Sequence, residues 1–85
     1  MINYVYVGGT NDGLTIVTQC LNGPLRVFKR VRKWNFQMPP PEFEYYMPHR
    51  VEYQSKIFDV LIHSSLVEQE AIELINLSPT KYLKV

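Results

Sequence analysis

The chain consists of short runs of β-branched and aromatic residues that alternate with turn-forming residues. The first run ends at Gly8-Gly9-Thr10-Asn11-Asp12-Gly13, and a second run follows at residues 14–20. Asp-Gly between two such runs is a strong hairpin signal, because glycine adopts the positive φ of a tight turn without a steric cost. A second turn of similar chemistry, Leu21-Asn22-Gly23-Pro24, comes next. The first third of the chain is therefore predicted to form a β-hairpin followed by a further strand.

The third predicted strand, residues 25–36, allows two registers. Strict alternation places one set of side chains on a single face: Arg26, Phe28, Arg30, Arg32, Trp34 and Phe36. A bulge near Phe28 would instead turn Leu25, Val27 and Phe28 inward. After this strand, Pro39-Pro40-Pro41 cannot donate hydrogen bonds to a sheet, so it divides the chain into a front half and a back half.

The strand signal returns at residues 42–54, and residues 56–63 form a fifth predicted strand after a Gln54-Ser55 turn. One side of residues 42–54 is predicted to face the core: Tyr45, Met47, His49, Val51 and Tyr53. Ser65-Leu66-Val67-Glu68 then matches a capping box and predicts that a helix begins at Ser65. Apolar residues at helical spacing form one face of that helix, and residues 80–85 form a short strand or a tail.

These segments predict an α+β fold: a small antiparallel sheet of about five strands in the order β-β-β-β-β-α, with one C-terminal helix packed on one face. The 85 residues leave room for one domain, residues 1–85, with the proline-rich link at residues 38–42 inside it. A chain this short buries only a little over ~60% of its unfolded surface, so its margin of stability is small.

The formal net charge of +1 conceals an asymmetry between the two halves. Residues 1–37 carry five Lys and Arg residues and one Asp, whereas residues 38–85 carry four Lys and Arg residues and seven acidic residues. The near-neutral total excludes a polybasic nucleic-acid tail and an acidic DNA mimic. The molecule is instead expected to be a dipole, with its positive charge concentrated in the third strand.

Neither a metal site nor an enzyme is predicted. Cys20 is the only cysteine, so an internal disulfide and a cysteine-rich metal site are excluded, and a reducing, cytoplasmic setting fits best. His49 and His63 lie at no metal-ligand spacing. Ser64, Ser65, Asp59 and His63 supply catalytic residue types in no recognised arrangement, and we expect no cofactor. The chain also lacks a basic signal-peptide start and a run of about 18 apolar residues, so we expect no membrane association.

Two segments are candidate binding sites. The first combines cations with aromatic rings, as single-stranded nucleic-acid binding does, and would equally suit a nucleotide or an acidic partner: Arg26, Lys29, Arg30, Arg32, Lys33, Trp34 and Phe36. A solvated strand face would have the same composition. The second, Tyr45-Tyr46-Met47, contains residue types that dominate protein interfaces, although it could also be buried core. Because the helix is acidic and the third strand is basic, the helix of one copy is predicted to contact the strand of another, which would form a homo-oligomer.

The segment Tyr6-Val7-Gly8-Gly9-Thr10-Asn11-Asp12-Gly13, followed by a basic β-rich segment and Tyr46-Met47-Pro48-His49-Arg50-Val51, resembles a group of small uncharacterised proteins of tailed bacteriophages. Many of these open with Tyr-Val-Gly-Gly-Pro-x-Asp-Gly and later carry a Tyr-x-x-x-Arg strand. The resemblance covers about half of the chain, and Thr10 stands where the group usually has proline. It implies a phage accessory protein in the cytoplasm of an infected bacterial cell, with no catalytic residue to carry over.

These observations lead to two hypotheses about function. The first is a non-enzymatic phage-type protein that binds a host protein, for example a defence protein, and modulates or inhibits it. The alternative is a module that binds single-stranded nucleic acid or a nucleotide through residues 26–36. Steep salt dependence of binding would favour the alternative, because it reports the number of phosphates neutralised.

Overall fold

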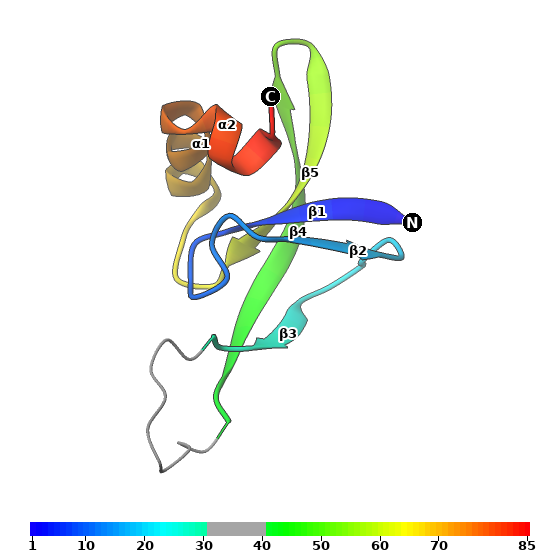
Figure 1. Ribbon diagram of the computed structural model, residues 1–85, viewed down its shortest axis with the longest axis vertical. Coiled ribbons are helices and arrows are strands. Elements are labelled where there is room, and N and C mark those ends of the chain that lie inside the picture. The colour runs from blue at the N-terminus through cyan, green and yellow to red at the C-terminus, as the bar shows by residue number, and fades with distance from the viewer. Residues whose placement is uncertain (31–40) are drawn as a thin grey trace.

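The computed structural model describes residues 1–30 and 41–85, and in them five strands precede two short helices (Figure 1). The elements are β1 (Ile2–Val7), β2 (Thr15–Thr18), β3 (Leu25–Phe28), β4 (Phe43–Tyr53), β5 (Lys56–His63), α1 (Glu68–Leu77) and α2 (Pro79–Leu83). The predicted α+β class and the five strands are confirmed. The second helix occupies residues for which a strand or tail was predicted; Pro79 suits the first turn of a helix because its missing N–H is not needed there.

The strands form one curled sheet in the order β2-β1-β5-β4-β3. Three neighbouring pairs are antiparallel, as predicted, but β1 and β5 are parallel. Strand β1 has the burial that is typical of parallel pairing, because Tyr4, Val5, Tyr6 and Val7 are all buried. A strand that is apolar on both faces needs neighbours on both edges and cover on both sides. Strand β5, which has buried residues on both faces too, supplies the second neighbour.

The core therefore has two parts, one on each face of β1 and β5. On one face, the two helices cover the sheet with Ala71, Ile75, Tyr82 and Leu83. On the other face, the curl of the sheet brings partly buried side chains of β2 and β3 over Tyr4, Tyr6, Tyr46 and Leu61. Each fully buried side chain of this size contributes about 1.5–3 kcal/mol. The helices thus cover only the central strands. The part of β4 that they do not cover has exposed side chains on that face.

The prediction for the core face of β4 is correct at one end and wrong at the other. Val51 is buried, but Tyr45 and Met47 are exposed, and the residues buried nearby are Glu44 and Tyr46 on the opposite face. Strand β4 pairs with β3 over its first four residues and with β5 from there to its end. Its first half lies beyond the reach of the helices, so its inner face is the one inside the curl of the sheet.

The third strand and the helix start also differ from expectation. Strand β3 ends at Phe28, and residues 31–36 of the predicted strand and 38–40 of the predicted link lie outside the described residues. Phe28 is exposed, which contradicts the bulged register and supports strict alternation. Helix α1 begins at Glu68 rather than Ser65; the Val67 N–H donates to Glu70 Oε1 at 3.2 Å, while Ser65 bonds to a histidine instead.

The predicted turn between β4 and β5 is present, and it carries backbone strain. Gln54 and Ser55 have φ values of 50° and 65°. Two successive positive φ values define the type I′ turn that suits a two-residue hairpin, a conformation that favours Asn-Gly. Each of these two residues consequently adopts a conformation that its side chain disfavours.

We expect the double substitution Gln54→Asn and Ser55→Gly to stabilise the fold by about 1 kcal/mol, because both new residues tolerate positive φ. Thermal unfolding should then shift upward by about 4–8 °C. The double alanine variant at the same positions is the control, since alanine retains the strain. An equal gain in both variants would contradict the explanation.

Candidate functional site

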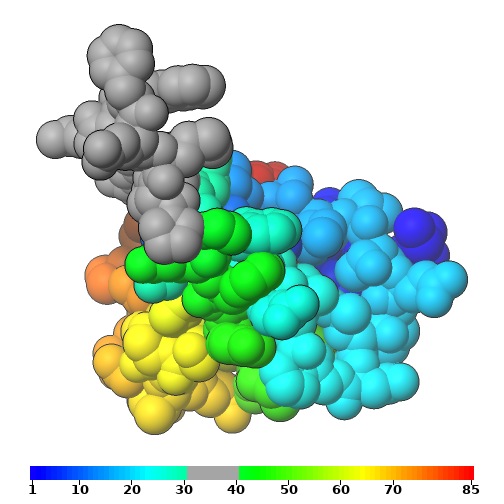
Figure 2. Space-filling model, turned by 90° about the horizontal axis from the view of Figure 1, so that it is seen from below, coloured from blue at the N-terminus to red at the C-terminus, as the bar shows by residue number. Residues whose placement is uncertain are grey.

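Five side chains on the uncovered part of the sheet form an exposed surface, here called the arm face. It consists of Arg26 and Phe28 on β3 and Phe43, Tyr45 and Met47 on β4. Phe28 is 62% exposed, Tyr45 49% and Met47 44%. Figure 2 views the molecule from this end, where atoms of β3 (blue-green) and of β4 (green) lie together at the surface. Four large hydrophobic side chains, Phe43 included, thus remain in contact with water where the helices do not reach.

The side chains of the arm face hold one another in place. The rings of Phe28 and Phe43 pack with their centroids 4.5 Å apart and their planes inclined by 34°. The guanidinium carbon of Arg26 lies 4.4 Å from the centroid of the Phe43 ring. Such aromatic and cation–π contacts contribute about 0.5–1.5 kcal/mol each beyond burial. These contacts form within the chain itself, without a partner.

The residues that the sequence analysis proposed for binding differ in where the structure places them. Tyr46 is fully buried, so it cannot contact a partner, and the surface contains Tyr45 and Met47 without it. Lys29 pairs with Glu42 at 3.4 Å, and Arg30 is exposed. Four residues of the predicted basic segment lie outside the described residues: Arg32, Lys33, Trp34 and Phe36.

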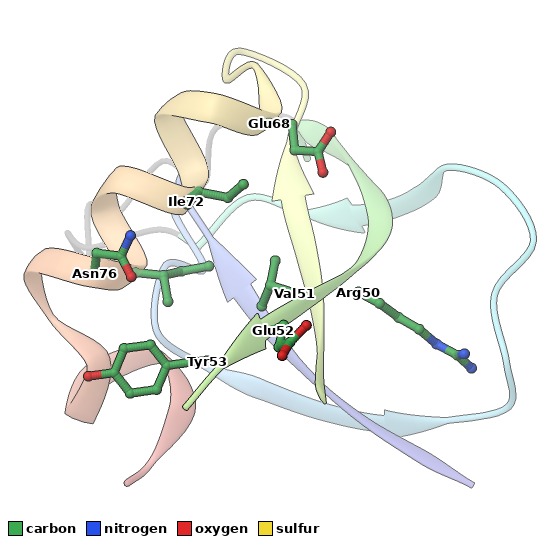
Figure 3. Close-up of a pocket in the computed structure, with 8 residues that line it drawn as sticks. Arg50, Val51, Glu52, Tyr53, Glu68, Ile72 and Asn76 are labelled. Atoms are coloured by element: carbon green, nitrogen blue, oxygen red, sulfur yellow. The ribbon is translucent and has the colours of Figure 1, made fainter. Parts of the chain in front are cut away.

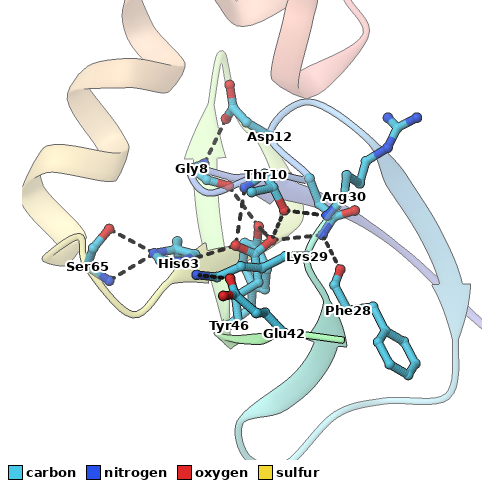
Figure 4. Close-up of polar contacts among 12 residues, drawn as sticks. Gly8, Thr10, Asp12, Phe28, Lys29, Arg30, Glu42, Tyr46, His63 and Ser65 are labelled. Carbon is cyan, nitrogen blue, oxygen red and sulfur yellow. Dashed lines mark hydrogen bonds and ion pairs between the residues drawn. The ribbon is translucent and has the colours of Figure 1, made fainter. Parts of the chain in front are cut away.

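Behind the arm face lies a buried carboxylate, Glu44, which joins three parts of the chain. Figure 4 shows the polar contacts in this region and labels its partners Thr10, Tyr46 and His63. The oxygens of Glu44 accept hydrogen bonds from the Thr10 hydroxyl at 2.7 Å, the Thr10 N–H at 3.2 Å and Asn11 Nδ2 at 2.8 Å. The Tyr46 hydroxyl lies 2.9 Å from Oε1 and 2.8 Å from the Gly8 carbonyl oxygen. His63 Nε2 lies 3.3 Å from Oε2. Glu44 thus connects the β1–β2 loop to β4 and β5.

These contacts keep Glu44 ionised. Burial alone would raise the pKa of the carboxyl group, but hydrogen bonds from Thr10, Tyr46 and Asn11 outweigh it and lower the pKa to about 2. Conversely, burial and the hydrogen bond to Glu44 raise the pKa of Tyr46. Among the residues described, no Lys or Arg side chain forms an ion pair with Glu44. The charge is balanced by oriented neutral donors, so removing any of them leaves a buried acceptor unsatisfied.

His63 connects Glu44 to the surface residue Ser65. Its Nδ1 accepts a hydrogen bond from the Ser65 N–H at 3.0 Å and lies 2.8 Å from the Ser65 hydroxyl. Because a backbone N–H can only donate, Nδ1 is the unprotonated nitrogen and Nε2 carries the hydrogen that points to Glu44. Serine, histidine and carboxylate follow one another as in a nucleophile–base–acid chain. The Nδ1 lone pair is already engaged, however, so the arrangement favours a structural role for His63.

A second carboxylate fastens the same loop from the other side. Asp12 accepts a hydrogen bond from the Gly8 N–H at 2.7 Å, and its other oxygen contacts Lys81 Nζ and the Tyr82 hydroxyl. Burial opposes ionisation of Asp12, but these bonds lower its pKa. Lys84 Nζ adds a bond to the Gly13 carbonyl at 3.0 Å. The β1–β2 loop is thus held between Glu44 and helix α2. The sequence predicted this loop only as a turn.

The hollows described are small. One of about 150 Å³ lies between β4 and α1, lined by Arg50, Val51, Glu52, Tyr53, Glu68, Ile72, Ile75 and Asn76 (Figure 3). Small-molecule sites usually enclose about 300–1,000 Å³. In the described part of the chain, no three His, Cys, Asp or Glu side chains are grouped to hold a metal ion. Within those same residues, no helix has the length and apolar character needed to cross a membrane.

We expect the contribution of Glu44 to stability to disappear in acid. The folded pKa, about 2, lies below the ordinary value of 4.5, so the contribution is complete above pH 4.5 and is lost as the pH falls toward 2. Glu44→Gln should destabilise the protein at pH 7 by about 1–3 kcal/mol, and its deficit relative to wild type should shrink across that interval. Urea unfolding of both proteins at several pH values measures this difference in the free energy of unfolding. A deficit that does not vary with pH would disprove the assignment.

We expect Gly9→Ala to be severely destabilising. Gly9 has a φ of +69°, and a Cβ there would collide with His63, with the Tyr46 hydroxyl and with Glu44. The cost should be about 2 kcal/mol or more. Gly23→Ala is the matched control, because nothing lies within 4 Å of a Cβ at that position. Thermal melts that show similar losses for both variants would contradict the packing around Gly9.

Comparisons with protein-family models, with curated proteins and with solved structures found no match. Among the residues that the structure describes, the arm face gathers four large exposed hydrophobic side chains that pack beside one another. The polar cluster around Glu44 lies directly behind it and fixes the strand from which three of its five side chains project.

Proposed function

We propose that this chain is a non-enzymatic protein-binding module that attaches to a bacterial host protein through the arm face and alters the action of that protein. The observation that carries the proposal is the exposed cluster of Arg26, Phe28, Phe43, Tyr45 and Met47. Arg, Phe, Tyr and Met are the residue types enriched at the centres of protein interfaces, where Lys and Glu are depleted. The bacterial partner follows from the sequence resemblance to phage proteins.

The packing within the arm face supports binding to a folded protein. Rings that already pack against each other, as Phe28 and Phe43 do, lose little further conformational entropy when they are buried, so they make effective anchors. Arg26 and Phe28 come from β3, whereas the other three side chains come from the adjacent strand, so the backbone ladder fixes their spacing. The pairing of Lys29 with Glu42 reduces the positive charge beside the anchors, which favours a protein over a polyanion.

The test compares two double alanine variants. We expect Phe28→Ala with Tyr45→Ala to weaken binding of the captured and then purified host protein at least about tenfold, because central aromatic anchors carry most of the binding energy. Ile57→Ala with Val67→Ala is the matched control, since both residues are exposed hydrophobics elsewhere on the molecule. It should bind as wild type does. Calorimetry or surface plasmon resonance measures the affinities.

Two results would overturn the proposal. Equal affinities of the arm variant and wild type would place the binding surface elsewhere. Tight binding of a single-stranded oligonucleotide that weakens steeply with salt and depends on Arg30 would favour the nucleic-acid alternative. Circular dichroism of each variant checks that the fold is retained, which is expected because all four side chains are exposed.

A further inference from the structure

Strand β2 forms one end of the sheet and has an open edge. It pairs with β1 through four residue pairs, from Ile2↔Thr18 to Val5↔Thr15. In the strand order of the described residues, nothing follows it on the other side. An edge strand of this kind presents main-chain donors and acceptors to any extended segment that can align with it.

The free groups on that edge belong to Thr15 and Val17. The Tyr6 N–H donates to the Leu14 carbonyl at 2.9 Å, so the carbonyl of Leu14 points toward β1, while its N–H donates to the Asn11 carbonyl within the loop. Hydrogen-bonded and non-hydrogen-bonded pairs alternate in an antiparallel ladder. Ile16 consequently points its groups toward β1 as well, while the N–H and C=O of Thr15 and Val17 point outward.

Apart from its short length of four residues, this edge lacks the usual devices that prevent strands from pairing. Proteins protect edge strands with lysine, proline, bulges or inward-pointing charges. Residues 13–25 contain no charged side chain, and β2 itself reads Thr-Ile-Val-Thr, all β-branched. Val17 is 60% exposed, and Leu14 next to the strand is 39% exposed. By contrast, β3 at the other end of the order carries Arg26.

We propose that β2 pairs with β2 of a second copy of this chain, antiparallel about a two-fold axis at Ile16. In this register, Thr15 of each copy exchanges both main-chain hydrogen bonds with Val17 of the other. The occupant is a second copy because antiparallel pairing of an uncharged, β-branched strand with itself brings no like charges together, and cross-strand Thr–Val and Ile–Ile contacts are favourable. The net charge of +1 adds little repulsion.

The contact is short, so the dimer should be weak and concentration-dependent. We expect sedimentation at about 10 µM to about 1 mM to show a mass rising from 10.0 kDa toward twice that value. Val17→Lys should raise the dissociation constant at least about tenfold, because it places a charge on each side of the contact. Ile57→Lys is the matched control: this side chain is 69% exposed, β-branched and on β5, and its loss should leave the dimer intact.

Amide exchange locates the contact. Protection of the Thr15 and Val17 amides should increase with protein concentration in wild type and not in Val17→Lys. The proposal is overturned if wild type remains monomeric at about 1 mM, if Val17→Lys dimerises like wild type, or if these two amides stay unprotected in the dimer. The result is independent of the arm face, since Phe28→Ala with Tyr45→Ala should dimerise normally.

Discussion

The buried Glu44 carboxylate is the interaction on which the arrangement of this small fold depends. It accepts hydrogen bonds from the β1–β2 loop, from its own strand and from β5, and so joins segments more than thirty residues apart. A buried charge is costly unless it is fully hydrogen-bonded, and here its pKa near 2 shows that the donors more than compensate for burial. The cluster requires Gly9, since any side chain there would fill the space that the donors occupy.

The placement of the helices explains what the surface exposes. Helices α1 and α2 cover β1, β5 and the far end of β4. The first half of β4 lies outside the area that these two helices cover, so the same strand is core at Val51 and surface at Tyr45. The arm face is thus the part of the sheet that the two helices do not reach.

Local signals predicted much of this fold, because they act over a few residues. The Asp-Gly turn after β1 and the Gln54-Ser55 turn are set by backbone chemistry, and alternation correctly separated Arg26 and Phe28 from Val27. The inner face of β4 and the role of Glu44 depend on which strands are neighbours in space. Thr10 and Asn11 lie far from Glu44 in sequence, so their hydroxyl and amide groups indicated a loop and gave no sign of a shared carboxylate.

The order of the strands has a consequence for how the two proposed surfaces combine. Strand β2 ends the order on one side, and β3, which carries part of the arm face, ends it on the other. Pairing through β2 uses main-chain groups at the sheet edge, whereas the arm face uses side chains on β3 and β4, so neither contact removes groups from the other. A dimer would therefore present two arm faces. For a host protein that is itself oligomeric, two weak contacts made at once are far stronger than either alone, provided that the spacing of the two faces allows both.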